Sequence, residues 1–380
     1  MSYFEYNNLI NNSIRKYSNF LDSFYSENLN FKLTKNSDIS PFARCFWIFG
    51  MHLIGRGDHL KKNKDKLSRL IINDIRDLKK SNNSDFLITK HYRQLVCFSL
   101  SALSILNYLD YDPLEDLIIE LVPKSIKENL DYYGCFYGKE QSGNHAMFIA
   151  IFLLHLRKYL NISNESLIYE WVNYHLDSIN SNGFWGTKKN ITYLQFQNGY
   201  HQYEIFEYLK IKPDVSIGKI ERFADKLGQF SPYPGGGGCY DYDAIFLLTN
   251  YGRHEVLIKT LITLLSIQNA DGGFSESREI RPRSLRKIVN HIKFCFSNIQ
   301  NTDMFFEKLR ILISLQLPKN NTISTHWTNY SREWGESNLW DSWFRMLSIA
   351  RIDMTTSQSF SWGFINYPGI GYHYSLINDK

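Results

Sequence analysis

The run from Gln268 to Phe274 (Gln-Asn-Ala-Asp-Gly-Gly-Phe) constrains the fold of this chain more than any other segment. It follows an apolar stretch, Leu257 to Ile267, whose periodicity is that of an amphipathic helix. The glycines allow a tight turn with positive φ, the glutamine can bind the last backbone groups, and the aromatic ring can pack back on the turn. The run therefore predicts a helix that ends in a glycine-hinged turn.

Helical periodicity also dominates the rest of the sequence, whereas convincing β alternation is scarce. We predict helices over residues 42–55, 65–80, 87–109, 113–130, 144–160, 164–180, 192–211, 216–228, 240–251, 254–269, 284–298, 303–317 and 338–352. The longer loops between them share glycines and aromatic residues, as at residues 134–138, 182–186, 235–238, 271–274, 333–335 and 362–364. Because the spacing of these loops varies, hairpins that close into a ring fit better than an open solenoid.

The sequence therefore predicts an all-α fold, an α/α toroid of about six helical hairpins. We expect residues 41–380 to form one domain, with residues 1–40, rich in Asn and Ser, as an N-terminal capping segment. Polar residues at the starts of successive inner helices would meet at one end of a central cavity. The candidates are His91-Tyr92-Arg93, Asn144-His145, Tyr200-His201-Gln202-Tyr203, Tyr240-Asp241-Tyr242-Asp243, and Asn338 with Asp341.

Composition narrows the ligand class without choosing one. Aromatic residues make up 16% of the chain, and their π faces suit either carbocations or sugar rings. The net charge of +5 is spread along the sequence without a recognition motif, so we expect no nucleic-acid partner. The five cysteines form no Cys-x-x-Cys, and metal-ligand spacing is absent. We expect buried thiols in a reducing compartment, and neither a metal nor another cofactor.

Two features bear on location. The N-terminal residues lack the charged start and the apolar run of a signal peptide. The longest apolar run, Ala146 to Leu154, is too short to span a bilayer. We therefore expect a cytoplasmic protein. Such a protein could still contact a membrane surface to collect a lipid substrate.

The stretch Gly235 to Asp243 is the most suggestive for chemistry. Four glycines permit close approach of the backbone, and two carboxylates follow at the start of an apolar helix. Asp241 or Asp243 could simply cap that helix by accepting its free N–H groups. Alternatively, burial in an aromatic cavity would raise the pKa of one carboxyl and keep it protonated, ready to protonate an alkene or a glycosidic oxygen.

The turn at Gln268 resembles the Gln-x-x-x-Gly-aromatic turn repeated through squalene–hopene cyclases, other class II terpene cyclases and the β-subunits of protein prenyltransferases. Class II cyclases carry Asp-x-Asp-Asp at the start of an inner helix. The run Asp241-Tyr242-Asp243-Ala244 is similar, with Ala244 in place of the last aspartate. The resemblance covers residues 130–352, and the chain is shorter than the two-domain triterpene cyclases. It implies an enzyme in which Asp243 protonates an isoprenoid double bond, Asp241 tunes that acid, and aromatic walls stabilise the cations.

Prenyltransferase β-subunits are similar in length and in the Gly-Gly-Cys-Tyr run from Gly237 to Tyr240. Their zinc site requires an aspartate two residues before that cysteine, where this chain has Gly237. It also requires a later histidine, which the helix around Asn338 to Asp341 lacks. These departures argue against a zinc-dependent prenyltransferase.

A carbohydrate-active enzyme is the alternative, because helical toroids also host glycan lyases, unsaturated-glycoside hydrolases and sugar epimerases. A non-catalytic relative that binds lipid or glycan is a third reading. Tyr outnumbers Trp by 25 to 8, which favours sugar. A cavity lined by Phe and Leu would favour an isoprenoid, and one lined by Tyr, His, Asn and Arg a glycan. His145, His201 and His326 are acid/base candidates, and the predicted substrate-binding residues are Tyr240, Tyr242, His145, His201, Tyr203, Trp340 and Asp341.

Overall fold

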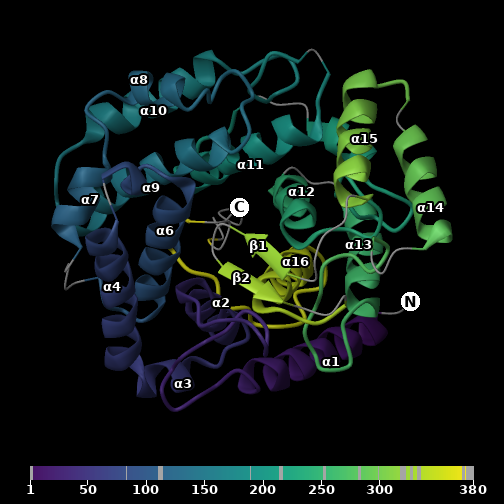
Figure 1. Cartoon of the computed structure of the whole chain (residues 1–380), viewed down its shortest axis with the longest axis horizontal. Coiled ribbons are helices and arrows are strands. Elements are labelled where there is room, and N and C mark those ends of the chain that lie inside the picture. Colours follow the sequence, from purple (N-terminus) through teal and green to yellow (C-terminus); the bar gives the residue numbers. More distant parts are fainter. Residues whose placement is uncertain are drawn as a thin grey trace. The chain divides into compact units, whose positions relative to one another are not determined.

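The computed structural model of this chain (Figure 1) describes residues 3–82, 84–109, 114–188, 190–213, 217–250, 254–280, 284–297, 299–316, 322–325, 328–331, 335–369 and 373. The chain folds into two compact units, each assembled from three separate segments. Unit 1 comprises Met1–Gly55, Lys188–Phe196 and Ser216–Gly363. Unit 2 comprises Arg56–Thr187, Gln197–Val215 and Phe364–Lys380.

Unit 1 consists mainly of helices. They are α1 (Tyr3–Asp22), α2 (Pro41–Leu53), the 3₁₀ helix η1 (Ile217–Phe223), α12 (Gly238–Asn250), α13 (His254–Ser266), α14 (Leu285–Phe296), α15 (Thr302–Gln316) and α16 (Leu339–Thr356). Strands β1 (Thr322–Thr325) and β2 (Thr328–Ser331) form a short antiparallel hairpin in which Thr322 pairs with Ser331.

The secondary structure described in unit 2 is helical. Its helices are α3 (Gly57–Lys62), α4 (Lys64–Ser81), α5 (Ser84–Leu87), α6 (Lys90–Ile105), α7 (Glu115–Leu121), α8 (Ile126–Tyr132), α9 (Ser142–Tyr159) and α10 (Glu165–Asp177). Helix α11 (Tyr193–Tyr208) begins in the second segment of unit 1 and continues in unit 2.

The all-α prediction is confirmed, with the β1–β2 hairpin as a small addition. The helix predicted over residues 113–130 is instead two helices, because Pro123 cannot continue α7 and Ser125 caps the start of α8. The segment predicted as a helix over residues 216–228 holds the 3₁₀ helix η1. Residues 3–22, part of the expected capping segment, form the long helix α1. Closure into a toroid and the single domain over residues 41–380 stay predictions.

The core of unit 1 lies around α16, which packs against α12, α2 and α13. Asn338 caps α16, and its Oδ1 accepts the N–H of Asp341 at 2.8 Å. Aromatic rings fill the contact with α2: Phe46 meets Trp340 with ring centroids 5.1 Å apart, and Phe49 meets Trp343 at 5.2 Å. Aromatic clusters of this kind fix the start of α16, where two candidate site residues, Trp340 and Asp341, lie.

The turn at Gln268 is present after α13. Gln268 Nε2 donates to the carbonyl oxygen of Gly272 at 2.8 Å and to that of Ser13 at 3.0 Å, so the glutamine ties the turn to itself and to α1. Gly272 has φ of +90°, and a Cβ there would lie 2.0 Å from the carbonyl oxygen of Lys16. Phe274 is fully buried. The predicted glycine-hinged turn is confirmed.

None of the helices in the described part of the chain combines the length and the apolar character needed to cross a bilayer.

Candidate functional site

The predicted site residues belong to both units. Tyr240, Asp241, Tyr242, Asp243, Trp340 and Asp341 lie in unit 1, whereas His145, His201 and Tyr203 lie in unit 2. Each set is described within its own unit below.

The starts of α12 and α16 lie together in unit 1. A Cβ on Gly238 would be 3.2 Å from Asp341 Oδ1, so the backbone of α12 reaches the Asp341 carboxylate closely. Asp341 Oδ2 accepts a hydrogen bond from Asn338 Nδ2 at 2.7 Å. Tyr240 is half-buried and packs edge-on against Tyr233. Tyr240 and Asp341 thus lie in the first turns of α12 and α16, respectively.

Asp241 is fully buried and bound to protein groups on both oxygens. Its Oδ1 accepts the N–H of Phe230 at 2.7 Å, and its Oδ2 lies 3.4 Å from Arg345 Nη1 of α16. Burial raises the pKa of Asp241 to about 6, and the charge of Arg345 opposes that rise. The carboxylate thus joins the segment before α12 to α16.

Gly236 explains part of the four-glycine run. It has φ of +73°, and a Cβ there would lie 2.4 Å from Asp241 Oδ2. Glycine therefore lets the backbone approach the buried carboxylate of Asp241 closely. At this position the close approach is to a group of the protein and not to a ligand.

Asp243 and Tyr242 lie in the first turns of α12 and are buried, with Asp243 3% exposed. The Tyr242 ring packs against Phe246 and Phe344, at centroid distances of 6.3 and 5.8 Å. Trp340 is half-buried and packs edge-on against Phe344. The aromatic contacts of the Asp-x-Asp run are thus those of Tyr242, whereas Asp241 binds polar groups.

A second group of polar residues gathers in unit 2 at the starts of α6 and α9, which pack together. We define the anion cluster as Lys90, Arg93, Tyr133, Asn144, His145 and His201. Arg93 is 3% exposed, and its guanidinium lies 5.4 Å from the centroid of the Tyr133 ring. Its Nε and Nη1 atoms have no hydrogen-bond partner, and no carboxylate in the described residues pairs with it.

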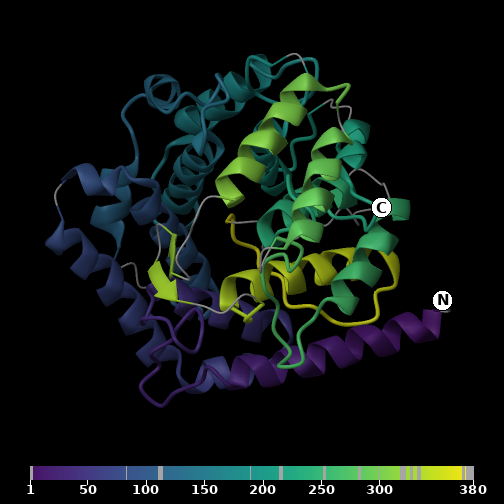
Figure 2. The same cartoon turned by 45° about the vertical axis from the view of Figure 1, so that its right-hand side comes forward.

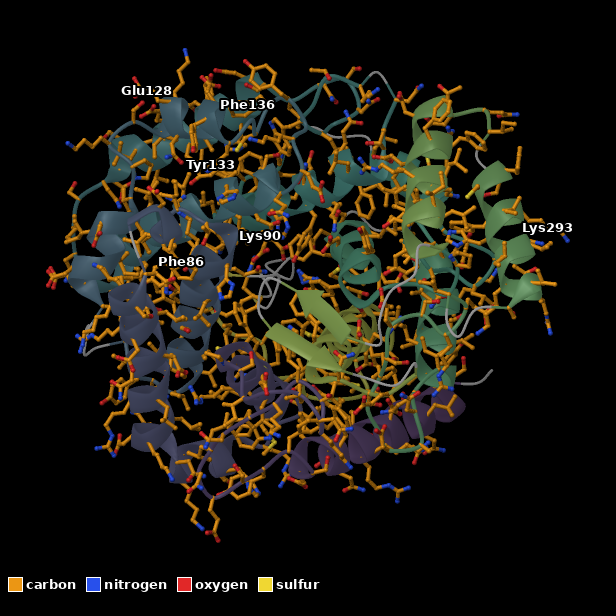
Figure 3. The ribbon with its side chains drawn as sticks, viewed as in Figure 1. Phe86, Lys90, Glu128, Tyr133, Phe136 and Lys293 are labelled. Atoms are coloured by element: carbon orange, nitrogen blue, oxygen red, sulfur yellow. The ribbon has the colours of Figure 1, made fainter. Side chains whose placement is uncertain are left out.

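The two histidines of the anion cluster are held by aromatic stacking and by an amide. The His145 ring lies parallel to that of Tyr133, at 3.8 Å between centroids and 8° between planes. His201 Nε2 lies 2.7 Å from Asn144 Nδ2. Nδ1 of both histidines is buried without a hydrogen-bond partner. Figure 3 labels Lys90 and Tyr133, which lie on this part of unit 2.

Positive charge surrounds both histidines. Burial, together with the charges of Arg93, Lys90 and Lys139, lowers the pKa of His145 to about 3. Burial and Lys90 likewise lower the pKa of His201 to about 3. Both rings are therefore neutral at pH 7. The positive ends of two long helices, α6 and α9, add to the field.

Other predicted residues have different surroundings. The Tyr203 hydroxyl donates to the carbonyl oxygen of Gly183, and its ring packs against Phe184 and Trp185. The run Tyr200 to Tyr203 lies in the middle of α11 rather than at a helix start. His326, another acid/base candidate, lies outside the described residues, as do Trp327 and Trp334. Lys90 and Tyr133 were missed, although Tyr133 directly precedes the aromatic–glycine loop at residue 134.

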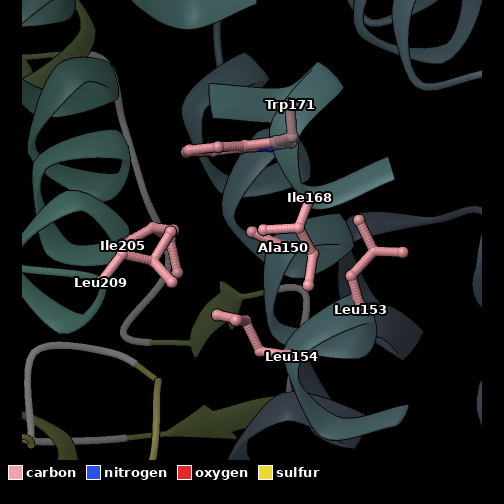
Figure 4. Close-up of a pocket in the computed structure, with 7 residues that line it drawn as sticks. All are labelled: Ala150, Leu153, Leu154, Ile168, Trp171, Ile205 and Leu209. Atoms are coloured by element: carbon pink, nitrogen blue, oxygen red, sulfur yellow. The ribbon is translucent and has the colours of Figure 1, made fainter. Parts of the chain in front are cut away.

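One cavity of unit 2 is apolar. It lies between α9, α10 and α11 (Figure 4), and its volume of about 10 Å³ is close to the space that a single water molecule needs. Its walls offer no group that could bind a polar substrate; they are formed by Ala150, Leu153, Leu154, Ile168, Trp171, Ile205 and Leu209. Within the described residues, no cluster of His, Cys, Asp and Glu could hold a metal ion.

No family model matches this sequence, and no curated protein or solved structure is significantly similar to it. The function must therefore be argued from the two groups of residues themselves.

Proposed function

We propose that this protein is an enzyme acting on acidic glycans, with the anion cluster of unit 2 as its site. The observation that carries the proposal is Arg93, a buried guanidinium that has no carboxylate partner among the described residues and lies beside two neutral histidines. This set of Tyr, His, Asn and Arg side chains is the lining expected for a glycan rather than for an isoprenoid.

An anion is the ligand that such a cluster stabilises best. Burying a guanidinium without a counter-ion is unfavourable, and a carboxylate can bind it through two parallel hydrogen bonds. Lys90 and Lys139, both close enough to lower the pKa of His145, would add to the attraction. A neutral hydrocarbon would leave these charges uncompensated. The cluster therefore favours a uronic acid, the sugar class that carries a carboxylate on its ring.

Exposed aromatic rings beside the cluster suit a sugar chain. Tyr132 is 67% exposed and contacts Tyr133 edge-on at 5.0 Å between centroids, and Tyr137 is 65% exposed. Sugar rings stack on aromatic faces of this kind. A glycan longer than one residue could therefore rest on these rings while its carboxylate binds Arg93.

The chemistry that fits these groups is β-elimination. Arg93 would bind the uronate carboxylate and so acidify the hydrogen on the neighbouring ring carbon C5. Neutral His145 would take that proton, and the electrons of the C–H bond would form the C4–C5 double bond as the glycosidic C4–O bond breaks. Water would protonate the departing oxygen. Because the bound carboxylate offsets Arg93 and the lysines, it would also raise the pKa of His145 and make it a better base.

The test compares Arg93→Met with Arg157→Met, a matched loss of a half-buried arginine from α9 of the same unit. A charged hydrogen bond contributes about 1.5–3 kcal/mol, so Arg93→Met should weaken calorimetric binding of an oligouronate about tenfold to hundredfold. Arg157→Met should leave the binding unchanged. Removal of the Arg93 charge should also raise the pKa of His145, which an NMR titration would follow.

Ultraviolet absorbance of the unsaturated uronate would report turnover directly. If the parent protein bound oligouronate but formed no unsaturated uronate, it would be a non-catalytic protein that binds glycans. Equal binding by the parent protein and Arg93→Met, or equal thermal stabilisation by neutral and acidic oligosaccharides, would disprove the role of the anion cluster.

The start of α12 favours a second function, a class II terpene cyclase-like activity on an isoprenoid. Its support is Asp243, which is 3% exposed and follows Tyr242, a ring packed against Phe344, together with Asp241, whose pKa burial raises to about 6. A carboxyl whose pKa is raised toward neutrality keeps a protonated fraction that could donate its proton to a double bond.

In this second function Asp243→Asn should abolish cyclisation of isoprenoid alcohols or diphosphates, whereas Arg93→Met should leave it intact. A thermal-shift screen that compares polyprenyl compounds with acidic oligosaccharides as ligands is the first experiment to distinguish the two functions. Full cyclisation by Asp243→Asn would remove Asp243 from the mechanism.

A further inference from the structure

Helix α14 of unit 1 exposes an unusual apolar stripe. Leu285 is 82% exposed, Val289 48%, Ile292 41% and Phe296 53%. Their spacing of four, three and four residues places all four side chains on one face of the helix. Single exposed apolar residues need no explanation, but four on one helical face form a surface that another body can cover.

The neighbouring helix extends this surface. Helix α15 packs against α14, and both views of the fold show the two side by side (Figures 1 and 2). On α15, Phe306 is 63% exposed and Ile313 56%. Met304 and Leu312, on another face of the same helix, are buried. We call the six exposed residues of α14 and α15 the apolar face: Leu285, Val289, Ile292, Phe296, Phe306 and Ile313.

The exposed charges on these helices have one sign. Arg286 and Lys293, seven residues apart, line the stripe on α14, and Arg310 is exposed on α15. Figure 3 shows Lys293 pointing away from the ribbon. The two acidic residues of α15 are half-buried and engaged: Asp303 pairs with Lys188, and Glu307 accepts the backbone N–H groups of Tyr193 and Leu194. Over residues 285–297 and 299–315 of the described chain, every fully exposed charge is therefore positive.

We propose that the apolar face and its basic residues bind the surface of an anionic lipid bilayer. Exposed Leu, Ile and Phe side chains would enter the interface between headgroups and acyl chains, while Arg286, Lys293 and Arg310 contact acidic headgroups. Charge distinguishes this occupant from a second copy of the chain. Two copies meeting through this face would bring six positive charges together without an opposing carboxylate, whereas a bilayer containing phosphatidylserine neutralises them. The proposal does not depend on either function proposed above.

The experiment is co-sedimentation of the full chain with large vesicles. One set of vesicles contains phosphatidylcholine alone, and in the other about one lipid in three is phosphatidylserine. We expect binding to the anionic vesicles only, weakened by added salt. The double variant Ile292→Ser/Phe296→Ser should lose binding at least tenfold, since it removes two of the apolar side chains that would enter the bilayer. Each of Arg286→Gln and Lys293→Gln should lose about fivefold, the equivalent of one basic contact with the surface.

The matched control is Tyr169→Ser, which removes a ring 63% exposed on α10 of unit 2 and should bind vesicles like the parent protein. Because all the changed side chains are exposed, urea unfolding should show the same stability for every variant. Three results would each overturn the proposal: no sedimentation of the parent protein with anionic vesicles, equal sedimentation of the double variant, or a stable dimer in sedimentation velocity that Ile292→Ser/Phe296→Ser dissociates. The last would assign the apolar face to a second copy of the chain. None of these readouts uses a glycan or an isoprenoid, so a failure here is distinct from a failure of the proposed function.

Discussion

Asp353→Ala should lower the free energy of unfolding of this protein by about 3–5 kcal/mol, one of the two largest effects that we expect from a single substitution. Asp353 lies in the last turn of α16 and is fully buried. Its carboxylate accepts hydrogen bonds from Ser357 Oγ, Ser359 N, Ser359 Oγ, Phe360 N and Trp362 Nε1. Alanine would leave these donors without their acceptor, and each unsatisfied buried group costs about 1–3 kcal/mol. Urea unfolding followed by tryptophan fluorescence would measure the loss.

Two further variants make this result specific. Asp353→Asn keeps the size of the side chain but replaces one acceptor oxygen by a donor, so its loss should be intermediate. Asp58→Ala removes a carboxylate that is 93% exposed and should leave the unfolding midpoint unchanged. An Asp353→Ala protein with the midpoint of the parent would show that the segment after α16 does not depend on this carboxylate.

The second large effect is expected at the buried ion pair of unit 1. Asp241→Asn should lower the free energy of unfolding by about 3–5 kcal/mol, because it leaves the Arg345 guanidinium buried without its counter-ion. Arg345 is 1% exposed, and its Nε and Nη2 atoms already lack hydrogen-bond partners. Thermal unfolding followed by circular dichroism would detect the change.

The double variant Asp241→Asn/Arg345→Met should recover part of this loss, because it removes the unpaired charge as well. Glu165→Gln, which breaks the exposed pair with Arg157, should change the stability by less than about 1 kcal/mol. If Asp241→Asn were as stable as the parent protein but lost isoprenoid cyclisation, Asp241 would be a group that tunes catalysis rather than one that holds α12 to α16.

Local sequence patterns predicted most of the helices, because burial of one face leaves a periodic signal. The helix α1 was missed within a segment rich in Asn and Ser. Yet Ile10, Ile14, Tyr17 and Leu21, all buried, repeat at intervals of four, three and four residues, which is the helical pattern. The break between α7 and α8 was also readable, since proline removes a donor inside a helix. Composition outweighed periodicity in the first case, and periodicity outweighed the proline in the second.

The candidate sites were less predictable, because their residues meet only through tertiary packing. Arg93 and His145 stood among the candidates, but nothing in the sequence indicates that Tyr133 lies between the two, stacked on one and facing the other. Likewise, the spacing of Asp241 and Asp243 suggested a shared role at the start of α12. Only the fold shows that Asp241 binds Arg345, 104 residues further along the chain.

The interleaving of the two units bears on how the chain matures during synthesis. Tyr367 is fully buried in unit 2, with its hydroxyl 3.0 Å from His155 Nδ1, and unit 1 draws most of its residues from 216–363. A nascent chain halfway through translation thus holds an incomplete copy of each unit. Both units need residues that emerge late before their apolar surfaces are covered, and exposed apolar surface makes a partly made polypeptide prone to aggregate.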